Sequence, residues 1–372
     1  SLQATVPSEG QASPFNHFIK PSPDQMLRAT VGLALKRARL ANVYSALRGK
    51  DASTGLDNPD KRDGQFALMR DAQSAVLNLA NWHHFLDALK LAGYRGQKMV
   101  SSEAAIIFSY VLYLIGGRDY GIDRTAMRQA IAEFYFMAAM TGRYTNSPES
   151  RFEADLAQVR DLATVAAFIA KLREICDTTL TGDYWDITLP SQLATSAARS
   201  PTLFAYQASL IMLDAPALFS PLKLAAMVDP AIKGSKAALE QHHLFPRGYL
   251  EEQGITDLKL INQIANFAPV EWPDNIKIGK QPPAQYVPAL DAKMTAEERE
   301  RIYALHALPH LWWELPYDQF LVERRLRMAQ VVRQAWKKLC GEPSNSTVAP
   351  ASVADLIAGG ETGAVEFKST LR

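Results

Sequence analysis

Apolar residues recur at intervals of three and four positions through most of the first 230 residues. This spacing places them along one face of an α-helix, whereas a half-buried strand would alternate apolar and polar residues. Gly and Pro separate the helical stretches, and Ser, Asp or Pro signals open them. They predict helices over 26–47, 65–92, 102–116, 122–141, 160–177 and 201–214, and therefore a domain of mutually buried helices over 24–230.

Composition and charge exclude several classes of protein. The 372 residues are 48% hydrophobic and 21% charged, as expected for a globular chain of about two to three domains. The 40 Lys and Arg balance the 39 Asp and Glu, so any nucleic-acid surface must be local. Cys176 and Cys340 are the only cysteines, which argues against a disulfide scaffold or a cysteine zinc site and favours the cytoplasm. The stretch from Ala104 to Gly117 is shorter than the roughly 18–20 residues of a membrane helix, so we expect no membrane partner.

The pattern of residues changes at about position 231. The segments 239–246 and 265–272 have the length and the flanking turn residues of short strands. Helices then resume at Thr295, which forms the sequence of a capping box with Glu298, and at Pro316, a residue favoured in the first turn of a helix. We therefore expect a second module, with two strands followed by helices.

Four boundaries divide the chain in this prediction. Residues 1–23 are rich in Ser, Pro, Gln and Gly and predict a poorly ordered lead-in. The helical domain occupies 24–230, and the second module with its flanking helices occupies 231–340. A linker rich in Pro, Ser and Asn follows at 341–352, and 353–372 resemble the first strand of an AlbA/Schlafen-type domain.

Two adjacent histidines, His242 and His243, lie at the end of the first predicted strand. In extended backbone they point to opposite faces, so one can face a metal ion while the other faces a water molecule. Asn262, Asn266 and Asn275 follow within a short stretch. Two histidines near a turn are usually structural polar residues, but the combination with the asparagines favours a functional site.

The order of these residues resembles the HNH nuclease motif on a ββα-metal fold. Eight residues separate Asn266 from Asn275, which begins a predicted helix. A denser match covers 236–290, and its quoted stretches are 242–250 (HHLFPRGYL), 261–266 (INQIAN), 271–278 (EWPDNIKI) and 283–286 (PAQY). These stretches resemble the HNH region of the GmrSD-type family, which groups restriction endonucleases acting on modified DNA with related phage-defence proteins. The helical stretches 134–144 and 147–149 are similar, more loosely, to the region that precedes that nuclease.

The resemblance implies a mainly α fold: a multi-helix domain with an embedded ββα-metal (HNH) nuclease module, without the ParB-like domain that opens members of the family. It implies that His243 is the general base, since imidazole has a pKa near neutrality. It also implies that His242 and Asn275 hold one divalent metal ion and that Asn266 braces the loop that carries the base. Because many HNH sites have Asp or Glu where this chain has His242, the metal, Mg²⁺ or Mn²⁺, is left open.

Basic residues in and beyond the motif are candidate contacts to DNA phosphates. Arg247, Lys277 and Lys280 lie inside the nuclease motif, and Arg324 begins a run of cations in the last predicted helix. That run is equally compatible with a solvated helix face.

The function expected is metal-dependent hydrolysis of DNA in restriction of modified or phage DNA. The alternatives are a non-catalytic DNA-recognition or coupling module with a degenerate HNH site, and an RNA nuclease. The sequence is also compatible with a homo-oligomer or with further domains of the same polypeptide.

Overall fold

The computed structural model describes residues 17–49, 58–228, 239–271, 276 and 278–342. The fold is mainly helical, as the sequence predicts. Backbone contacts divide the chain into two compact units, an N-terminal unit over 1–179 and a C-terminal unit over 180–372. Most of the predicted lead-in and linker, and all of the segment predicted to begin a further domain, lie outside the described residues.

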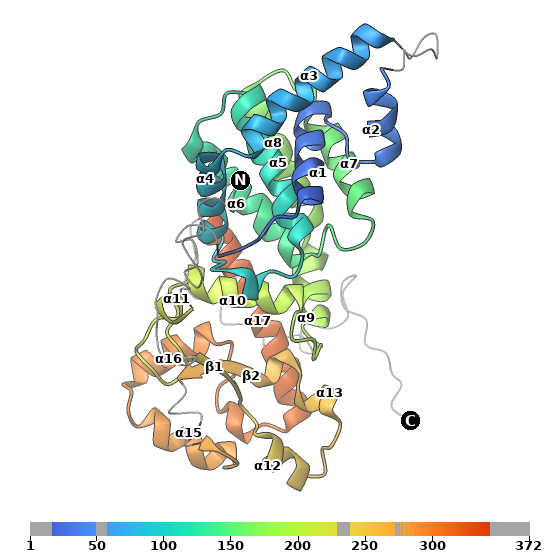
Figure 1. Ribbon diagram of the computed structural model, residues 1–372. Coiled ribbons are helices and arrows are strands. Elements are labelled where there is room, and N and C mark those ends of the chain that lie inside the picture. Colours follow the sequence, from blue (N-terminus) through green and yellow to red (C-terminus); the bar gives the residue numbers. More distant parts are fainter. Residues whose placement is uncertain (1–16, 50–57, 229–238, 272–275, 277, 343–372) are drawn as a thin grey trace, which may run out of the picture. The chain divides into compact units, whose positions relative to one another are not determined.

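The N-terminal unit contains only helices among its described residues. Helices α5 and α6 form its centre, because almost every side chain from Ala105 to Gly116 and from Ala130 to Met140 is buried. Figure 1 shows α5 among α1, α4 and α6, against which it packs. The elements are α1 (Pro23–Leu35), α2 (Leu40–Leu47), α3 (Pro59–Val76), α4 (Leu79–Leu91), η1 (Gln97–Met99), α5 (Glu103–Asp119), α6 (Arg124–Met140), α7 (Pro148–Val159) and α8 (Val165–Thr179).

Two helices predicted to be continuous are each broken in the structure. The first ends at Leu35, because Lys36 takes a left-handed conformation with φ 52°, and α2 restarts at Leu40. The second break separates α3 from α4 at Asn78, whose side chain caps α4 by accepting a 2.9 Å hydrogen bond from the Ala80 N–H. Asn favours the N-cap position, so the apolar periodicity continues across the break while the helix does not.

A carboxylate from α7 holds the start of α2. Oε2 of Glu153 accepts hydrogen bonds from the backbone N–H groups of Ala38, at 2.6 Å, and Arg39, at 3.0 Å. Oε1 accepts from the side chains of Arg37 and Asn42, both at 2.9 Å. Burial alone would raise the pKa of Glu153, but these four donors outweigh it and lower the pKa to about 2. One side chain therefore replaces the N-cap that the α2 sequence lacks.

The C-terminal unit combines helices with a two-stranded sheet. Its elements are η2 (Tyr184–Thr188), α9 (Leu189–Gln192), α10 (Pro201–Met212), α11 (Leu224–Met227), β1 (Leu239–His243), α12 (Arg247–Glu252), α13 (Leu258–Ile261), η3 (Ile264–Asn266), β2 (Phe267–Glu271), α15 (Pro283–Asp291), α16 (Ala296–Leu305), η4 (Trp312–Glu314) and α17 (Tyr317–Leu339). Both predicted helix starts are confirmed: Thr295 and Glu298 form the capping box of α16, and Pro316 is the N-cap of α17.

The domain boundary expected at 230 lies inside the C-terminal unit. Helix α10 packs along α17, which is more than a hundred residues away in the sequence. The buried ring of His306 makes a 2.9 Å hydrogen bond through Nε2 to the carbonyl of Pro216, and burial lowers the pKa of His306 to about 4. Helix α10, which was expected to belong to the first domain, therefore packs within the same unit as the two strands. In the described parts of the chain, no helix is both long and apolar enough to cross a bilayer.

Candidate functional site

The two histidines lie at the end of β1, where it pairs with β2. The strands are antiparallel, with His242 opposite Ala268 and His243 opposite Phe267. Between them the chain makes a long excursion through α12, α13 and η3. After β2, Ile276 and Ile278 are helical.

His243 is the half-buried member of the pair. Its Nε2 lies 3.0 Å from Oδ1 of Asn262. Because an amide oxygen only accepts hydrogen bonds, this contact assigns the proton of the neutral imidazole to Nε2 and leaves Nδ1 as the proton acceptor. Burial and the charge of Arg247 lower the pKa of His243, and together they outweigh the opposing effect of the Asn262 hydrogen bond. The neutral, proton-accepting form is therefore favoured at pH 7.

His242 is buried and has different neighbours. The ring of Tyr286 meets its imidazole edge-on, at 5.7 Å between ring centroids. The Tyr286 hydroxyl donates a 2.6 Å hydrogen bond to the carbonyl of Leu244, the residue that follows the pair. The two imidazoles thus face different surroundings, as alternation along a strand requires.

Asn266 connects the two ends of the segment that joins β1 to β2. Its side chain is fully buried, and Oδ1 accepts a 2.9 Å hydrogen bond from the Phe245 N–H. Nδ2 donates to the carbonyls of Phe245 and Ile261, both at 3.0 Å. The Asn266 carbonyl accepts a further 2.8 Å bond from the Leu244 N–H. This is the geometry expected of a residue that braces the loop after the histidines, whereas its importance for catalysis stays a prediction.

Aromatic residues pack against the loop that follows His243. The ring of Phe245 contacts those of Phe320, at 4.8 Å, Tyr317, at 5.3 Å, and Trp312, at 5.8 Å between centroids. The hydroxyl of Tyr317 also donates to the carbonyl of Leu260, at 2.8 Å. Helix α17 and η4 therefore fix the backbone that carries His243.

Arg324 does not contact solvent, and the prediction that it binds DNA is wrong for this structure. Its side chain is 0% exposed. Nη1 donates a 2.6 Å hydrogen bond to the carbonyl of Ala265, and Nε and Nη2 donate longer bonds to the carbonyl of His306. The cause is helical spacing, since Arg324 lies four residues from both Phe320 and Met328 on the buried face of α17.

Three further cations of α17 are also engaged within the C-terminal unit. Arg325 donates to Gln263 at 2.8 Å, Arg333 pairs with Asp186 at 3.0 Å, and Lys338 donates to the carbonyl of Met212 at 2.8 Å.

Two of the predicted DNA contacts lie side by side on the surface. Arg247 begins α12 and pairs with Glu251 at 2.7 Å. A Cβ added at Gly248 would lie 3.0 Å from Cδ of Lys280, so the Lys280 side chain lies over the start of α12. Both cations are exposed, which leaves them available to a phosphate backbone. Lys277 lies outside the described residues.

The expected metal site is only partly described. His242 is in place, but Asn275 lies outside the described residues. Within the described chain no group of three or more His, Cys, Asp or Glu side chains could hold a metal ion. A single neutral imidazole is a weak site for Mg²⁺, so the described residues do not by themselves form a metal centre.

Two residues of the site were given no role from the sequence alone. Asn262 fixes the tautomer of His243. Tyr286 contacts the ring of His242 and donates a hydrogen bond to the carbonyl of Leu244. Both lie within the stretches that carry the family resemblance, at 261–266 and 283–286, which was the available signal.

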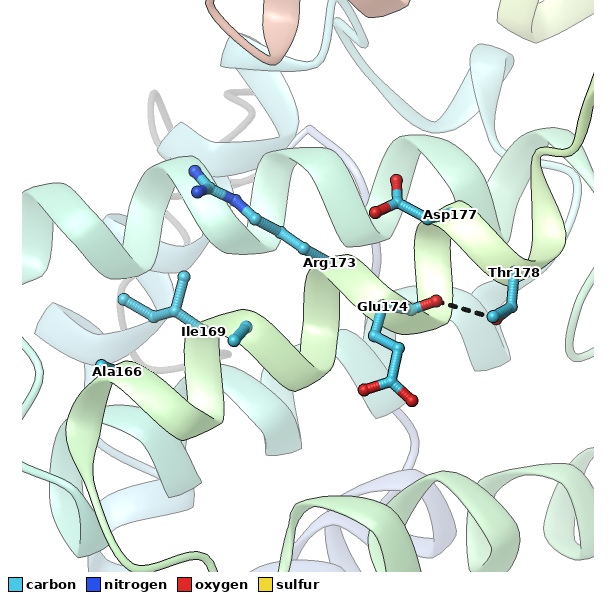
Figure 2. Close-up of a pocket in the computed structure, with 7 residues that line it drawn as sticks. Ala166, Ile169, Arg173, Glu174, Asp177 and Thr178 are labelled. Carbon is cyan, nitrogen blue, oxygen red and sulfur yellow. Dashed lines mark hydrogen bonds between the residues drawn. The ribbon is translucent and has the colours of Figure 1, made fainter.

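Other features of the N-terminal unit do not form a comparable site. A hollow of about 700 Å³ runs along one exposed face of α8, and Figure 2 shows that its side chains point in different directions from a single helix. In the stretch that more loosely resembles the family, the buried Arg143 makes two hydrogen bonds to Asp155, at 2.9 and 2.5 Å, and Tyr144 donates to the same carboxylate at 2.6 Å. These groups satisfy one another and hold the connection between α6 and α7.

Comparison of the chain with models of known protein families, with curated proteins and with solved structures found no match.

Proposed function

We propose that the chain is an endonuclease that hydrolyses DNA phosphodiester bonds and acts in the restriction of modified or phage DNA. The observation that carries this proposal is the hydrogen bond between Nε2 of His243 and Asn262. It orients a neutral imidazole whose Nδ1 can take a proton from an attacking water, which is the task of a general base. The resemblance to the GmrSD-type HNH region supports the same assignment.

The remaining residues have separate tasks in this proposal. Asn266 keeps the loop after His243 in one conformation through its three side-chain hydrogen bonds. Arg247 and Lys280 bind phosphates of the DNA backbone beside the histidine. A divalent ion, Mg²⁺ or Mn²⁺, held by His242 and Asn275 would neutralise the scissile phosphate and stabilise the leaving 3′ oxygen.

Nicking of supercoiled plasmid tests the proposal. Unmodified plasmid and plasmid with phage-type modified bases are incubated with the full chain in Mg²⁺, Mn²⁺ or EDTA. We expect metal-dependent nicking that falls by about 10²–10⁴-fold in His243→Ala, the usual contribution of a general base. His84→Ala is the matched control, because His84 also follows another histidine and is half-buried, but lies in α4 of the N-terminal unit.

Two outcomes would contradict the proposal. Wild-type protein that binds the plasmid without nicking it under any condition would favour a recognition module with a degenerate site. Preferential cleavage of RNA in a competition with DNA would make the protein an RNA nuclease.

A further inference from the structure

A cavity of about 600 Å³ lies within the C-terminal unit, formed by the end of α15, α16, the loop before η4, η4 itself and α17. Its volume is within the range of roughly 300–1,000 Å³ that small ligands occupy. The wall combines apolar side chains with Arg299, Arg327, Asp291, Tyr303 and Trp313. We refer to it as the α16 cavity.

The two arginines of the α16 cavity make no ion pair with a described residue, although Arg299 lies within range of the charge of Asp291 and Arg327 within range of that of Glu323. Arg299 on α16 and Arg327 on α17 are each half-buried. Neither makes a hydrogen bond or an ion pair with any other part of the chain that the structure describes, whereas Arg324, Arg325 and Arg333 on the same α17 all do. Partial burial of a guanidinium group without a partner costs free energy, which an anionic ligand would recover.

Trp313 forms an aromatic part of the cavity wall. Its ring meets that of Tyr303 at 6.4 Å and 73°, and that of Trp312 at 6.0 Å and 84°. Such edge-to-face contacts hold the indole in a fixed orientation. A fixed aromatic ring next to arginines is the combination that binds a nucleobase together with its phosphate.

The one buried acid of the cavity is already engaged. Asp291 accepts a 2.6 Å hydrogen bond from the Tyr303 hydroxyl through Oδ1. Burial raises the pKa of Asp291, and the Tyr303 bond and the charge of Arg299 act in the opposite direction. The other acid of the lining, Glu300, is exposed. The carboxylate of Asp291 can accept a further hydrogen bond through Oδ2, and an amino group of a base is a donor of this kind.

We propose that the α16 cavity binds a nucleotide unit, with the base against Trp313 and the phosphate at Arg299 and Arg327. The unit is either a free nucleoside monophosphate or one nucleotide of a DNA strand. Because none of these residues contributes to the histidine site, the proposal does not depend on the nuclease activity proposed above.

Equilibrium binding in EDTA, where metal-dependent cleavage is absent, tests the proposal on the full chain. The probe is a short, fluorescently labelled, 5′-phosphorylated single-stranded oligonucleotide, and the competitors are dAMP, adenosine and inorganic phosphate. We expect Arg299→Gln and Arg327→Gln each to weaken binding by about tenfold or more, the usual loss of a charge-assisted hydrogen bond. Each should also reduce the salt dependence of log K by about one unit.

Arg301→Gln is the matched control, since Arg301 is exposed on the same helix and does not line the cavity. We expect it to change affinity by less than about twofold, since exposed charges away from a ligand contribute little. Arg327→Lys, which keeps the charge, should retain part of the binding, and thermal unfolding shows whether each variant is folded.

The competitors decide between the remaining outcomes. Competition by dAMP supports a free nucleotide as ligand, whereas competition only by the unlabelled oligonucleotide supports a nucleotide within DNA. The proposal is overturned if adenosine or inorganic phosphate competes as well as dAMP and the unlabelled oligonucleotide, if Arg301→Gln weakens binding as much as Arg327→Gln, or if the labelled oligonucleotide does not bind.

Discussion

Replacing Asn266 by alanine tests whether one amide holds the loop that carries the histidines. In the native protein Oδ1 pairs with the N–H of Phe245, and Nδ2 pairs with the carbonyls of Phe245 and Ile261. The Ile261 carbonyl would keep a long contact, 3.5 Å, from the hydroxyl of Tyr317. The buried N–H and carbonyl of Phe245 would each lose their hydrogen bond to the Asn266 side chain. Each buried group left unpaired costs about 1–3 kcal/mol, so the free energy of unfolding should fall by about 2–6 kcal/mol.

Urea unfolding monitored by tryptophan fluorescence measures this loss. Trp312 lies 5.8 Å from the ring of Phe245, so its emission reports on the same loop. Asn262→Ala is the control, because it removes a single hydrogen bond to a half-buried ring and should cost only about 0.5–1.5 kcal/mol. A cost below about 1 kcal/mol for Asn266→Ala, or one no larger than that of Asn262→Ala, would show that α17 holds the loop without the amide.

Three further predictions concern charge. The rate of plasmid nicking should rise with pH, because the general base must be neutral. The midpoint should lie below about 6.5, the ordinary pKa of imidazole, because burial lowers the pKa of His243. A midpoint above that value would contradict the assignment of His243 as the base. Glu153→Gln should destabilise the N-terminal unit at pH 7, because a pKa depressed from 4.5 to about 2 stabilises the fold above pH 4.5, and this contribution is lost as the pH falls through 2. Acid titration by circular dichroism should therefore show a weaker loss of stability between pH 4.5 and 2 in the variant, and equal losses would refute the argument. Arg324→Met should destabilise the C-terminal unit by about 1–3 kcal/mol and leave the salt dependence of DNA binding unchanged. Arg247→Gln should instead reduce the salt dependence of log K by about one unit. The reverse pattern would restore Arg324 as a DNA contact.

Local features of the structure followed from the sequence. The capping box of Thr295 and Glu298 and the start of α17 at Pro316 depend on residues close to one another in the chain, and each short strand was predicted from its own residues. The opposite surroundings of His242 and His243 followed from strand geometry alone.

Features that depend on packing were harder to predict. Asn262 follows α13 and reaches His243 only because the excursion after β1 folds back on the strand. Helix breaks at Lys36 and Asn78 were missed, since apolar periodicity continues through them. For Arg324 a signal existed, because Phe320 and Met328 at four-residue spacing mark the buried face of α17.

The cations of the C-terminal unit show why a run of basic residues is a weak indicator of nucleic-acid binding. Arg324 begins such a run, yet its guanidinium group donates its hydrogen bonds to backbone carbonyls. Arg299 was given no role from the sequence and Arg327 was one cation of that run, but in the described chain neither has an ion-pair partner, and both line the same cavity. Electrostatic attraction for a phosphate depends on charge that the fold has not already neutralised. Affinity for nucleic acid should therefore be more sensitive to Arg299 and Arg327, despite their separation in the sequence, than to the other cations of the run.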